Sequence, residues 1–310
     1  MKIVVTGGLG YIGSSTVLSM IEKGYEPIII DNLSTSNIQV LEFLQEASGK
    51  EVIFFEADLT NFHSMETIFR KLSFDGIIHF AAFKSVGESM RNPLKYYENN
   101  VVSLINIVKL ALKSNVYDLI FSSSCTVYGQ PEDLPIFESS PFLDTPSAYG
   151  KTKQICEYIL KDACATSDLK TFSLRYFNPI GAHKSGKVGE FQKGEPQNLV
   201  PLLTQTASGK REKFFVHGGD YLTADGSAIR DYIDVNDLAA AHLIALEKLK
   251  GIDTSGYYDS LNLGTGKGTS VLELIAVFEQ ELGINEIIKR IYGASRSYRQ
   301  EMVEKTSSLR

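Results

Sequence analysis

Short apolar runs alternate with longer amphipathic stretches along the first half of the chain. The runs have the length and composition of buried β-strands and lie at residues 3–6, 27–31, 52–55, 76–80, 119–122 and 171–175. Between them, apolar residues recur every three or four positions, as they do on helices. Buried strands separated by helices form parallel sheets joined by right-handed crossovers. The pattern therefore predicts an α/β fold, a doubly wound parallel sheet of the Rossmann type, with ligands at the carboxyl ends of its strands.

The alternation fades after Arg175, and residues 178–197 are rich in glycine, lysine and polar side chains. Such a stretch is typical of a long functional loop. We therefore expect residues 1–177 to form the first domain and residues 178–310 a smaller α/β domain. Part of 231–263 is expected to return to the first domain.

Composition and charge narrow the class of protein. The 310 residues carry a net charge of −6, which disfavours nucleic acid as the main partner. The three cysteines have no CxxC spacing, and Met1 to Val5 lead directly into a glycine turn with no room for a signal peptide. No stretch approaches the roughly 18 apolar residues of a membrane span. We therefore expect a cytoplasmic protein with no membrane anchor and, since the histidines lack ligand spacing, no metal.

Three glycines at three-residue spacing, Gly7, Gly10 and Gly13, follow the first strand and open a helix. Because glycine has no Cβ, such a turn lets the backbone approach a pyrophosphate bound at the helix N-terminus. The glycines alone would equally suit a tight turn without a ligand. The strand before them and the helix after them favour a dinucleotide site.

Acidic residues after the next two strands indicate which dinucleotide binds. Asp31 ends the second strand, where a carboxylate accepts hydrogen bonds from the adenosine ribose and repels a 2′-phosphate. The residues that follow include no arginine: Asn32, Leu33 and Ser34. The cofactor predicted is therefore NAD rather than NADP. Asp58 and Leu59, after the third strand, are placed to contact adenine, although Asp58 would also suit a helix N-terminus.

Tyr149 and Lys153 are four residues apart and so share one face of a helix. Ser122 and Ser124 end the fifth strand, at the edge where such a sheet binds ligands. We expect the ammonium and a cationic nicotinamide to lower the tyrosine pKa from about 10 and favour the phenolate. The tyrosine can then take a proton from a substrate hydroxyl while the carbon loses hydride, with Ser124 orienting that oxygen. The Tyr/Lys spacing alone is also common on solvated helices.

The ordered set of motifs resembles the extended short-chain dehydrogenase/reductase family and, within it, the UDP-glucose 4-epimerases. The stretches that carry the resemblance are TGGLGYIGS (6–14), DNLS (31–34), IHFAAFKSVGES (78–89), YYENN (96–100), FSSSCTVYG (121–129), YGKTK (149–153), RYFNPIGAH (175–183), NLVP (198–201) and DGSAIRDYIDVNDLA (225–239). The resemblance implies reversible C4 epimerisation of UDP-glucose and UDP-galactose through a 4-keto sugar, with tightly bound NAD. It also suggests a homodimer.

The resemblance implies further cofactor contacts in the first domain. They are Tyr11 and Ile12 at the pyrophosphate, Phe80, Ala81, Ala82, Phe83, Lys84 and Asn99 on the nicotinamide side, and Tyr176 and Phe177 flanking the cofactor. Lys84 would also reach the substrate. Taken alone, Lys84 equally suits a solvated loop and Asn99 a helix cap.

The implied substrate contacts lie mostly in the second domain. They are Asn178, Asn198 and Leu199 at the nucleotide sugar, Phe215, Val216 and His217 at the uracil, and Arg230 and Arg296 at the diphosphate. Guanidinium groups match phosphates bidentately, although Arg296 alone would also suit a surface salt bridge.

The residues after the strand-end serine separate epimerisation from dehydration. Relatives that dehydrate sugar nucleotides carry an Asp-Glu pair there, whereas this chain has Cys125 and Thr126, which disfavours elimination. Two other functions stay open: a 4-epimerase of another UDP-sugar, such as an N-acetylhexosamine or uronate, and a dinucleotide-sensing regulator. Such sensors generally lose the Tyr/Lys pair that this chain keeps.

Overall fold

The computed structural model describes residues 1–191, 193–196, 198–216 and 218–283. The chain divides into two compact units. Of the described residues, the first contains Met1–Gly194 and Ile233–Gly264, and the second contains Glu195–Tyr232 and the residues from Thr265 to Gly283.

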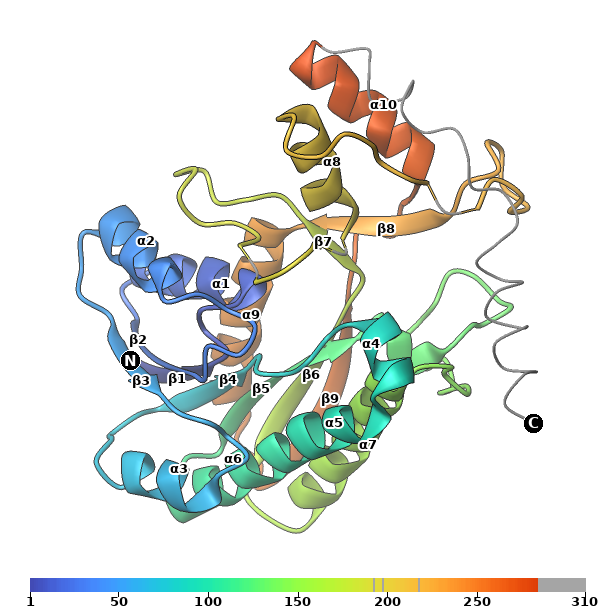
Figure 1. Cartoon of the computed structure of the whole chain (residues 1–310). Helices are drawn as coiled ribbons and strands as arrows, with labels where there is room; N and C mark the ends of the chain where they lie inside the picture. The colour runs from blue at the N-terminus through green and yellow to red at the C-terminus, as the bar shows by residue number, and fades with distance from the viewer. Residues whose placement is uncertain (192, 197, 217, 284–310) are drawn as a thin grey trace. The chain divides into compact units, whose positions relative to one another are not determined.

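A seven-stranded sheet forms the centre of the first unit, with the order β3-β2-β1-β4-β5-β6-β9 (Figure 1). All of its neighbouring strands are parallel: β1 (Lys2–Thr6), β2 (Glu26–Asp31), β3 (Ile53–Glu56), β4 (Gly76–His79), β5 (Asp118–Ser124), β6 (Lys170–Tyr176) and β9 (Tyr257–Leu263). The predicted strands and the doubly wound fold class are confirmed. The seventh strand, β9, was not predicted, because Asp259, Ser260 and Asn262 interrupt its apolar pattern.

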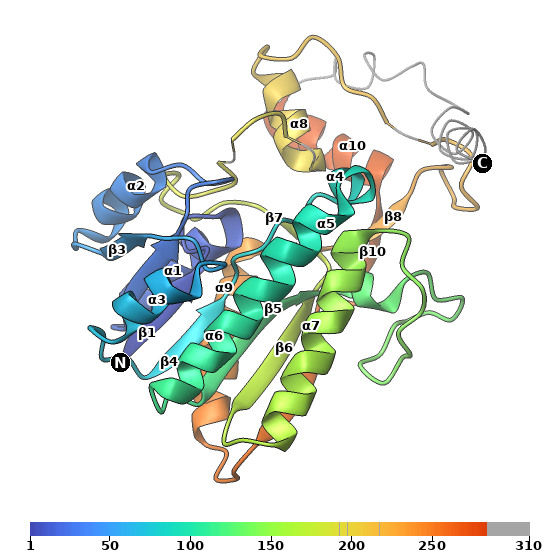
Figure 2. The same ribbon diagram turned by 60° about the horizontal axis from the view of Figure 1, so that its bottom comes forward.

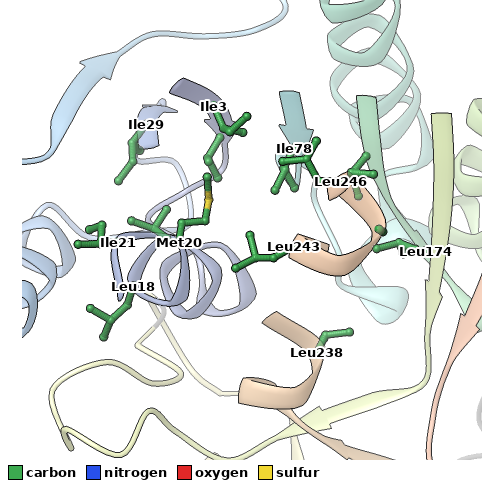
Figure 3. Packing of buried hydrophobic residues seen from close by; sticks show 14 of the residues in the cluster. Ile3, Leu18, Met20, Ile21, Ile29, Ile78, Leu174, Leu238, Leu243 and Leu246 are labelled. Atoms are coloured by element: carbon green, nitrogen blue, oxygen red, sulfur yellow. The ribbon is translucent and has the colours of Figure 1, made fainter. Parts of the chain in front are cut away.

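Helices cover both faces of this sheet. One face is covered by α1 (Tyr11–Glu22), α2 (Gln39–Ser48) and α9 (Val235–Lys250), and the other by α3 (Phe62–Phe69), α6 (Val102–Lys113) and α7 (Ala148–Ala165) (Figure 2). Figure 3 shows part of the first layer, in which side chains of α1 and α9 meet those of β1, β2 and β4: Met20, Leu243, Leu246, Ile3, Ile29 and Ile78. Burial of these apolar faces is the main force that holds the layers together.

Local signals explain where several helices begin. Ser147 caps α7 by accepting a hydrogen bond from the Gly150 amide, and Asp234 caps α9 in the same way with the Asn236 amide. The shorter elements of the first unit are α4 (Val86–Arg91), α5 (Pro93–Tyr96), a π-helical turn (Tyr97–Val101) that continues into α6, a 3₁₀ turn (Cys125–Tyr128) and β7 (Asn178–Ile180).

The strand order reverses between β1 and β4. Thr6, the last residue of β1, pairs with Ile30 on one side and with His79 on the other. The connections that leave these strands run in opposite directions, and doubly wound sheets bind ligands in the crevice that opens at such a point. The glycine turn after β1 therefore begins at the edge where the fold places a ligand.

The second unit contains α8 (Leu199–Ala207), β8 (Ile229–Asp234), β10 (Gly268–Ser270) and α10 (Val271–Leu282). β8 leads back into the first unit at Ile233 and pairs antiparallel with β10. A small core of Leu203, Phe214 and Ile275 lies between α8 and α10. A capping box formed by Ser270 and Glu273 begins α10. Among the residues that the structure describes, no helix is both long and apolar enough to cross a membrane.

Candidate active site

The glycine turn after β1 has no space for a side chain at Gly7 or at Gly13. Gly7 has a φ of 67°, and a Cβ there would lie 2.7 Å from the backbone nitrogen of Ala81. A Cβ on Gly13 would collide with the carbonyl oxygen of Gly7. Gly10 precedes α1 without a side-chain cap, so the first-turn N–H groups have the arrangement that binds an anion. The turn therefore fits a pyrophosphate.

Asp31 joins the glycine turn to the loop that follows β2. Its carboxylate accepts hydrogen bonds from the Leu9 amide (3.2 Å), the Leu33 amide (3.0 Å) and the Ser36 hydroxyl (2.7 Å). The residue is only 8% exposed. A carboxylate has about four acceptor positions, so these bonds leave capacity for a ribose hydroxyl. Ser36 was missed by sequence reasoning, because no spacing rule connects it to Asp31.

Asp58 and Leu59 belong to a tight turn after β3. The Asp58 carboxylate accepts hydrogen bonds from the amide (2.8 Å) and hydroxyl (2.7 Å) of Thr60. The Leu59 carbonyl accepts a bond of 2.8 Å from the Asn106 amide group of α6. The adenine contact of these residues stays a prediction.

Asn100, in the π-helical turn, fixes the segment of residues 80–84. Its side chain accepts a hydrogen bond from the Phe83 amide (2.8 Å) and donates to the Phe83 carbonyl (3.0 Å) and the Thr152 hydroxyl (3.2 Å). The amide of Asn99, the residue predicted from the resemblance, donates to the Asn100 side chain at 3.0 Å. Single π-helical turns are frequent at functional sites. Asn99 and Asn100 form a polar pair beside an apolar helical stretch, and this pair could have pointed to Asn100 in the sequence.

Lys84 forms a salt bridge of 3.1 Å with Glu190 of the long loop. Burial and the negative charges of Glu190 and Asp234 raise the pKa of Tyr11, whose hydroxyl donates to the Gly181 carbonyl at 2.7 Å. Lys84, which is predicted to contact the cofactor and the substrate, is thus paired with the Glu190 carboxylate in the polypeptide without ligands.

The residues predicted to carry out the chemistry, Ser124, Tyr149 and Lys153, lie together at the end of β5. The Lys153 ammonium donates to the Ser122 carbonyl at 2.5 Å and lies 5.9 Å from the centroid of the Tyr149 ring. The side chain of Ser124 acts to lower the pKa of Tyr149. Ser122, Ser124 and Lys153 are buried, so their interactions act in a low dielectric.

The expected lowering of the Tyr149 pKa depends on the ammonium and a cationic nicotinamide together, and the polypeptide without cofactor shows the opposite direction. Burial raises the pKa of Tyr149 to about 12, and the side chain of Ser124 only partly opposes this. Burial also lowers the pKa of Lys153 to about 8, opposed by the charges of Cys156 and Glu157. Desolvation favours the neutral form of both groups, and it outweighs the attraction that the spacing suggested.

Glu157, one turn beyond Lys153, ties α7 to three strands. Its carboxylate accepts hydrogen bonds from Ser123 of β5, from Arg175 of β6 (2.7 Å to Nη2) and from Tyr258 of β9 (2.8 Å). Both Glu157 and Arg175 are buried. The spacing of Tyr149, Lys153 and Glu157 along one helix face was readable in the sequence, but the partners of Glu157 were not.

Tyr176 ends β6, and Phe177 follows it. The Tyr176 hydroxyl lies 2.5 Å from the Nε2 atom of His242 on α9, and the Phe80 ring lies 4.8 Å from the His242 ring between centroids. The Phe177 amide donates to the Leu263 carbonyl at 3.1 Å. His242 was missed by sequence reasoning because a single histidine in an apolar helix gives no signal of its partners.

The predicted substrate residues are divided between the two units. Lys84, Ser124, Tyr149 and Asn178, which begins β7, belong to the first unit. The second contains Asn198 and Leu199 at the start of α8, Phe215, Val216, and Arg230 in β8. The Arg230 guanidinium donates to the Ile229 carbonyl at 2.7 Å. His217 and Arg296 lie outside the described residues. The substrate roles of all these residues stay predictions.

Comparison with known proteins identifies the family. The model described as the NAD dependent epimerase/dehydratase family matches residues 3–264. The chain belongs to this family. Within the NAD dependent epimerase/dehydratase family, it is 45% identical over 289 residues to a UDP-glucose 4-epimerase of Drosophila melanogaster, covering 91% of this chain and 82% of that protein. The identity to a UDP-glucose 4-epimerase of Bacillus subtilis is 46% over 284 residues, covering 91% and 83%.

A solved structure of this family has the same fold. The crystal structure of UDP-glucose 4-epimerase from Bifidobacterium longum in complex with NAD+ and UDP matches with a TM-score of 0.88 and 41% identity. The match covers 95% of this chain and 86% of that one.

The family includes dehydratases, and the 3₁₀ turn after β5 bears on that alternative. Cys125 and Thr126 begin this turn, and the Thr126 amide donates to the Ser124 hydroxyl at 3.2 Å. Neither residue is a carboxylic acid, so the acid–base pair expected for dehydration is not present at these two positions.

Proposed function

We propose that the chain catalyses the reversible C4 epimerisation of UDP-glucose and UDP-galactose through a 4-keto sugar, with tightly bound NAD. The observation that carries this proposal is the grouping of Ser124, Tyr149 and Lys153 at the end of β5, at the same edge of the sheet as the glycine turn. Relatives of 45–46% identity named UDP-glucose 4-epimerase support it.

The first unit offers the groups that NAD requires. The turn from Gly7 to Gly13 and the start of α1 would hold the pyrophosphate, and Asp31 the adenosine ribose. The segment of residues 80–84, Asn99, Tyr176 and Phe177 would line the nicotinamide. When bound, NAD supplies a hydride acceptor that can return the hydride, so the cycle needs no net redox partner.

Tyr149 moves the proton in this scheme. As the phenolate, its oxygen takes the proton of the sugar 4-hydroxyl, and the resulting phenol gives the proton back at the end of the cycle. Ser124 hydrogen-bonds the same sugar oxygen and orients it. Lys153 supplies a positive charge that favours the phenolate, against the effect of burial.

The UDP group would be held by the residues that the resemblance to the family implies: Lys84, Asn178, Asn198, Leu199, Phe215, Val216, His217, Arg230 and Arg296. Binding through the diphosphate would leave the sugar free to turn, so that either face of C4 meets the cofactor. This rotation is what permits the change of configuration.

One preparation of the full chain tests the proposal. The purified protein is denatured and the supernatant assayed for NAD, while native protein is incubated with UDP-galactose and the products are separated. We expect released NAD in near-stoichiometric amount and conversion to UDP-glucose. Absence of both cofactor and conversion would overturn the proposal.

We also propose a homodimer in which α6 and α7 pack against their mates. The buried face of α7 contains Cys156, Leu160 and Cys164, whereas Ile155 and Tyr158 point outward and are 37% and 57% exposed. Exposed apolar side chains on long helices favour association. No disulfide joins the three cysteines, all of which are described, and this suits the cytoplasmic location that we propose.

A further inference from the structure

A line of buried side chains lies behind the ends of β5 and β6. It begins at Ser122 of β5, whose side chain acts to lower the pKa of Tyr176 against the larger effect of burial. The Tyr176 hydroxyl lies 2.5 Å from Nε2 of His242. His242 is fully buried, at 0% exposure, and its Nδ1 lies 2.7 Å from the Leu238 carbonyl oxygen one turn earlier on α9.

The carbonyl of Leu238 fixes the direction of both hydrogen bonds of His242. A carbonyl oxygen can only accept, so Nδ1 of His242 must carry the proton. In the neutral ring, Nε2 then has only a lone pair, and the Tyr176 hydroxyl must donate to it. Burial lowers the pKa of His242 to about 4, so the ring is neutral at pH 7. The lone pairs of the Tyr176 oxygen are then left to accept from another donor.

The line reaches the proposed active site at two points. The carbonyl of Ser122 holds the Lys153 ammonium at 2.5 Å, and the charge of an ionised Tyr149 raises the pKa of Tyr176, after the larger effect of burial. The ring of Phe80, on the nicotinamide side, packs on His242. His242 itself touches none of the groups assigned to proton or hydride transfer.

We propose that His242 is a positioning residue for the reaction. By accepting the hydrogen bond of the Tyr176 hydroxyl, it orients that hydroxyl at the end of β6. The neighbouring end of β5 carries Ser124, and its Ser122 carbonyl holds Lys153 of α7. The role in turnover rests on the proposed function, whereas the direction of the hydrogen bonds does not. An ordinary core histidine would contribute to stability only.

The first test measures the proton position without any assay of turnover. In protein labelled with ¹⁵N-histidine, the His242 signals are assigned by their loss in His242→Gln. We expect the Nδ1–H form at pH 7, and a shift of the Nε2 signal in Tyr176→Phe when the donor is removed. A proton on Nε2, or an Nε2 signal unchanged by Tyr176→Phe, would overturn the proposal.

The second test separates positioning from stability. His242→Leu removes the acceptor, and we expect kcat for UDP-galactose to fall about tenfold, the scale of one lost hydrogen bond, with KM within about twofold. His242→Gln keeps an acceptor and should restore most of kcat. In Tyr176→Phe, His242→Leu should cause little further loss, because the shared bond is already absent.

Leu246→Ala is the matched control, since Leu246 is buried one turn further along α9 but lies outside the line. It should lower the thermal stability while kcat stays unchanged. A His242→Leu variant that behaves like Leu246→Ala would make His242 a structural residue only. If the unmodified chain converts no UDP-galactose, the proposed function fails together with the role in turnover, while the ¹⁵N result still decides the bond direction.

Discussion

At the scale of single residues, one physical cause explains the opposite pKa shifts of Tyr149 and Lys153. Burial raises the pKa of the phenol to about 12 and lowers that of the ammonium to about 8. In the polypeptide alone, both groups are therefore driven toward their neutral forms. A positive charge brought by the cofactor would act in the opposite direction on the phenol. Proton abstraction is thus expected to depend on the bound dinucleotide.

The Tyr149→Phe variant tests the proton-transfer role. The ring keeps its packing, but the oxygen that exchanges the proton is lost, so we expect kcat to fall at least about a hundredfold. Conversion of UDP-galactose is the measurement. Tyr158→Phe, on an exposed part of the same helix, is the control and should retain activity. Near-normal turnover by Tyr149→Phe would remove Tyr149 from this role.

The Lys153→Ala variant tests the electrostatic role of the ammonium. Its positive charge favours the phenolate, so its removal should move the acidic limb of the pH–rate profile to higher pH. Lys151→Ala is a matched control, because Lys151 lies on the same helix but forms an exposed salt bridge of 3.3 Å with Asp144. A profile that stays in place in Lys153→Ala would contradict the prediction.

At the scale of elements, the turn between β1 and α1 combines two constraints on Gly7. The residue has a positive φ, and its Cα faces the backbone of Ala81 after β4. The first constraint is local, whereas the second exists only because β4 pairs beside β1. The close approach of the two strand ends shapes the proposed pyrophosphate site.

Gly7→Ala should therefore cost more than the backbone conformation alone. Gly24 has a φ of 84°, and a Cβ added there would meet no atom within 4 Å, so Gly24→Ala reports only the left-handed strain, about 1–2 kcal/mol. We expect Gly7→Ala to lower the thermal midpoint further and to reduce the NAD retained on purification. Equal effects of the two substitutions on midpoint and NAD content would contradict the proposed crowding.

At the scale of the whole molecule, apolar side chains outside the core bear on assembly. On α6, Leu104, Ile107 and Ala111 are buried, while Val102 is partly exposed, as Ile155 is on α7. Packing against the sheet uses only one face of each helix. The outward faces are the surfaces that the proposed homodimer would bury.

Ile155→Glu should convert a dimer to monomers, because a carboxylate would have to be buried in the helix–helix contact. Ile244→Glu is the control: Ile244 is 49% exposed and lies on α9, on the other side of the sheet. Light scattering coupled to size-exclusion chromatography gives the mass of each variant. A monomeric parent chain, or a dimer that survives Ile155→Glu, would refute this assembly.

Much of the fold, and the pairing of Tyr149 with Lys153, could be predicted from the sequence. Strands such as β1 and β2 are continuous apolar runs, and Tyr149 and Lys153 share a helix face by spacing alone. The strand β9 escaped prediction because polar residues occupy it. The domain limits and the roles of individual site residues stay predictions.

Local patterns determined the sheet, the glycine turn and the candidate acid–base pair, because each depends on residues close together in the chain. The tertiary structure decided the partners of Asn100, Glu157 and His242, since these lie on other elements. It also decided the sign of the Tyr149 pKa shift. Spacing can indicate that a charge is near, but desolvation depends on everything packed around the group, and only the folded chain determines that.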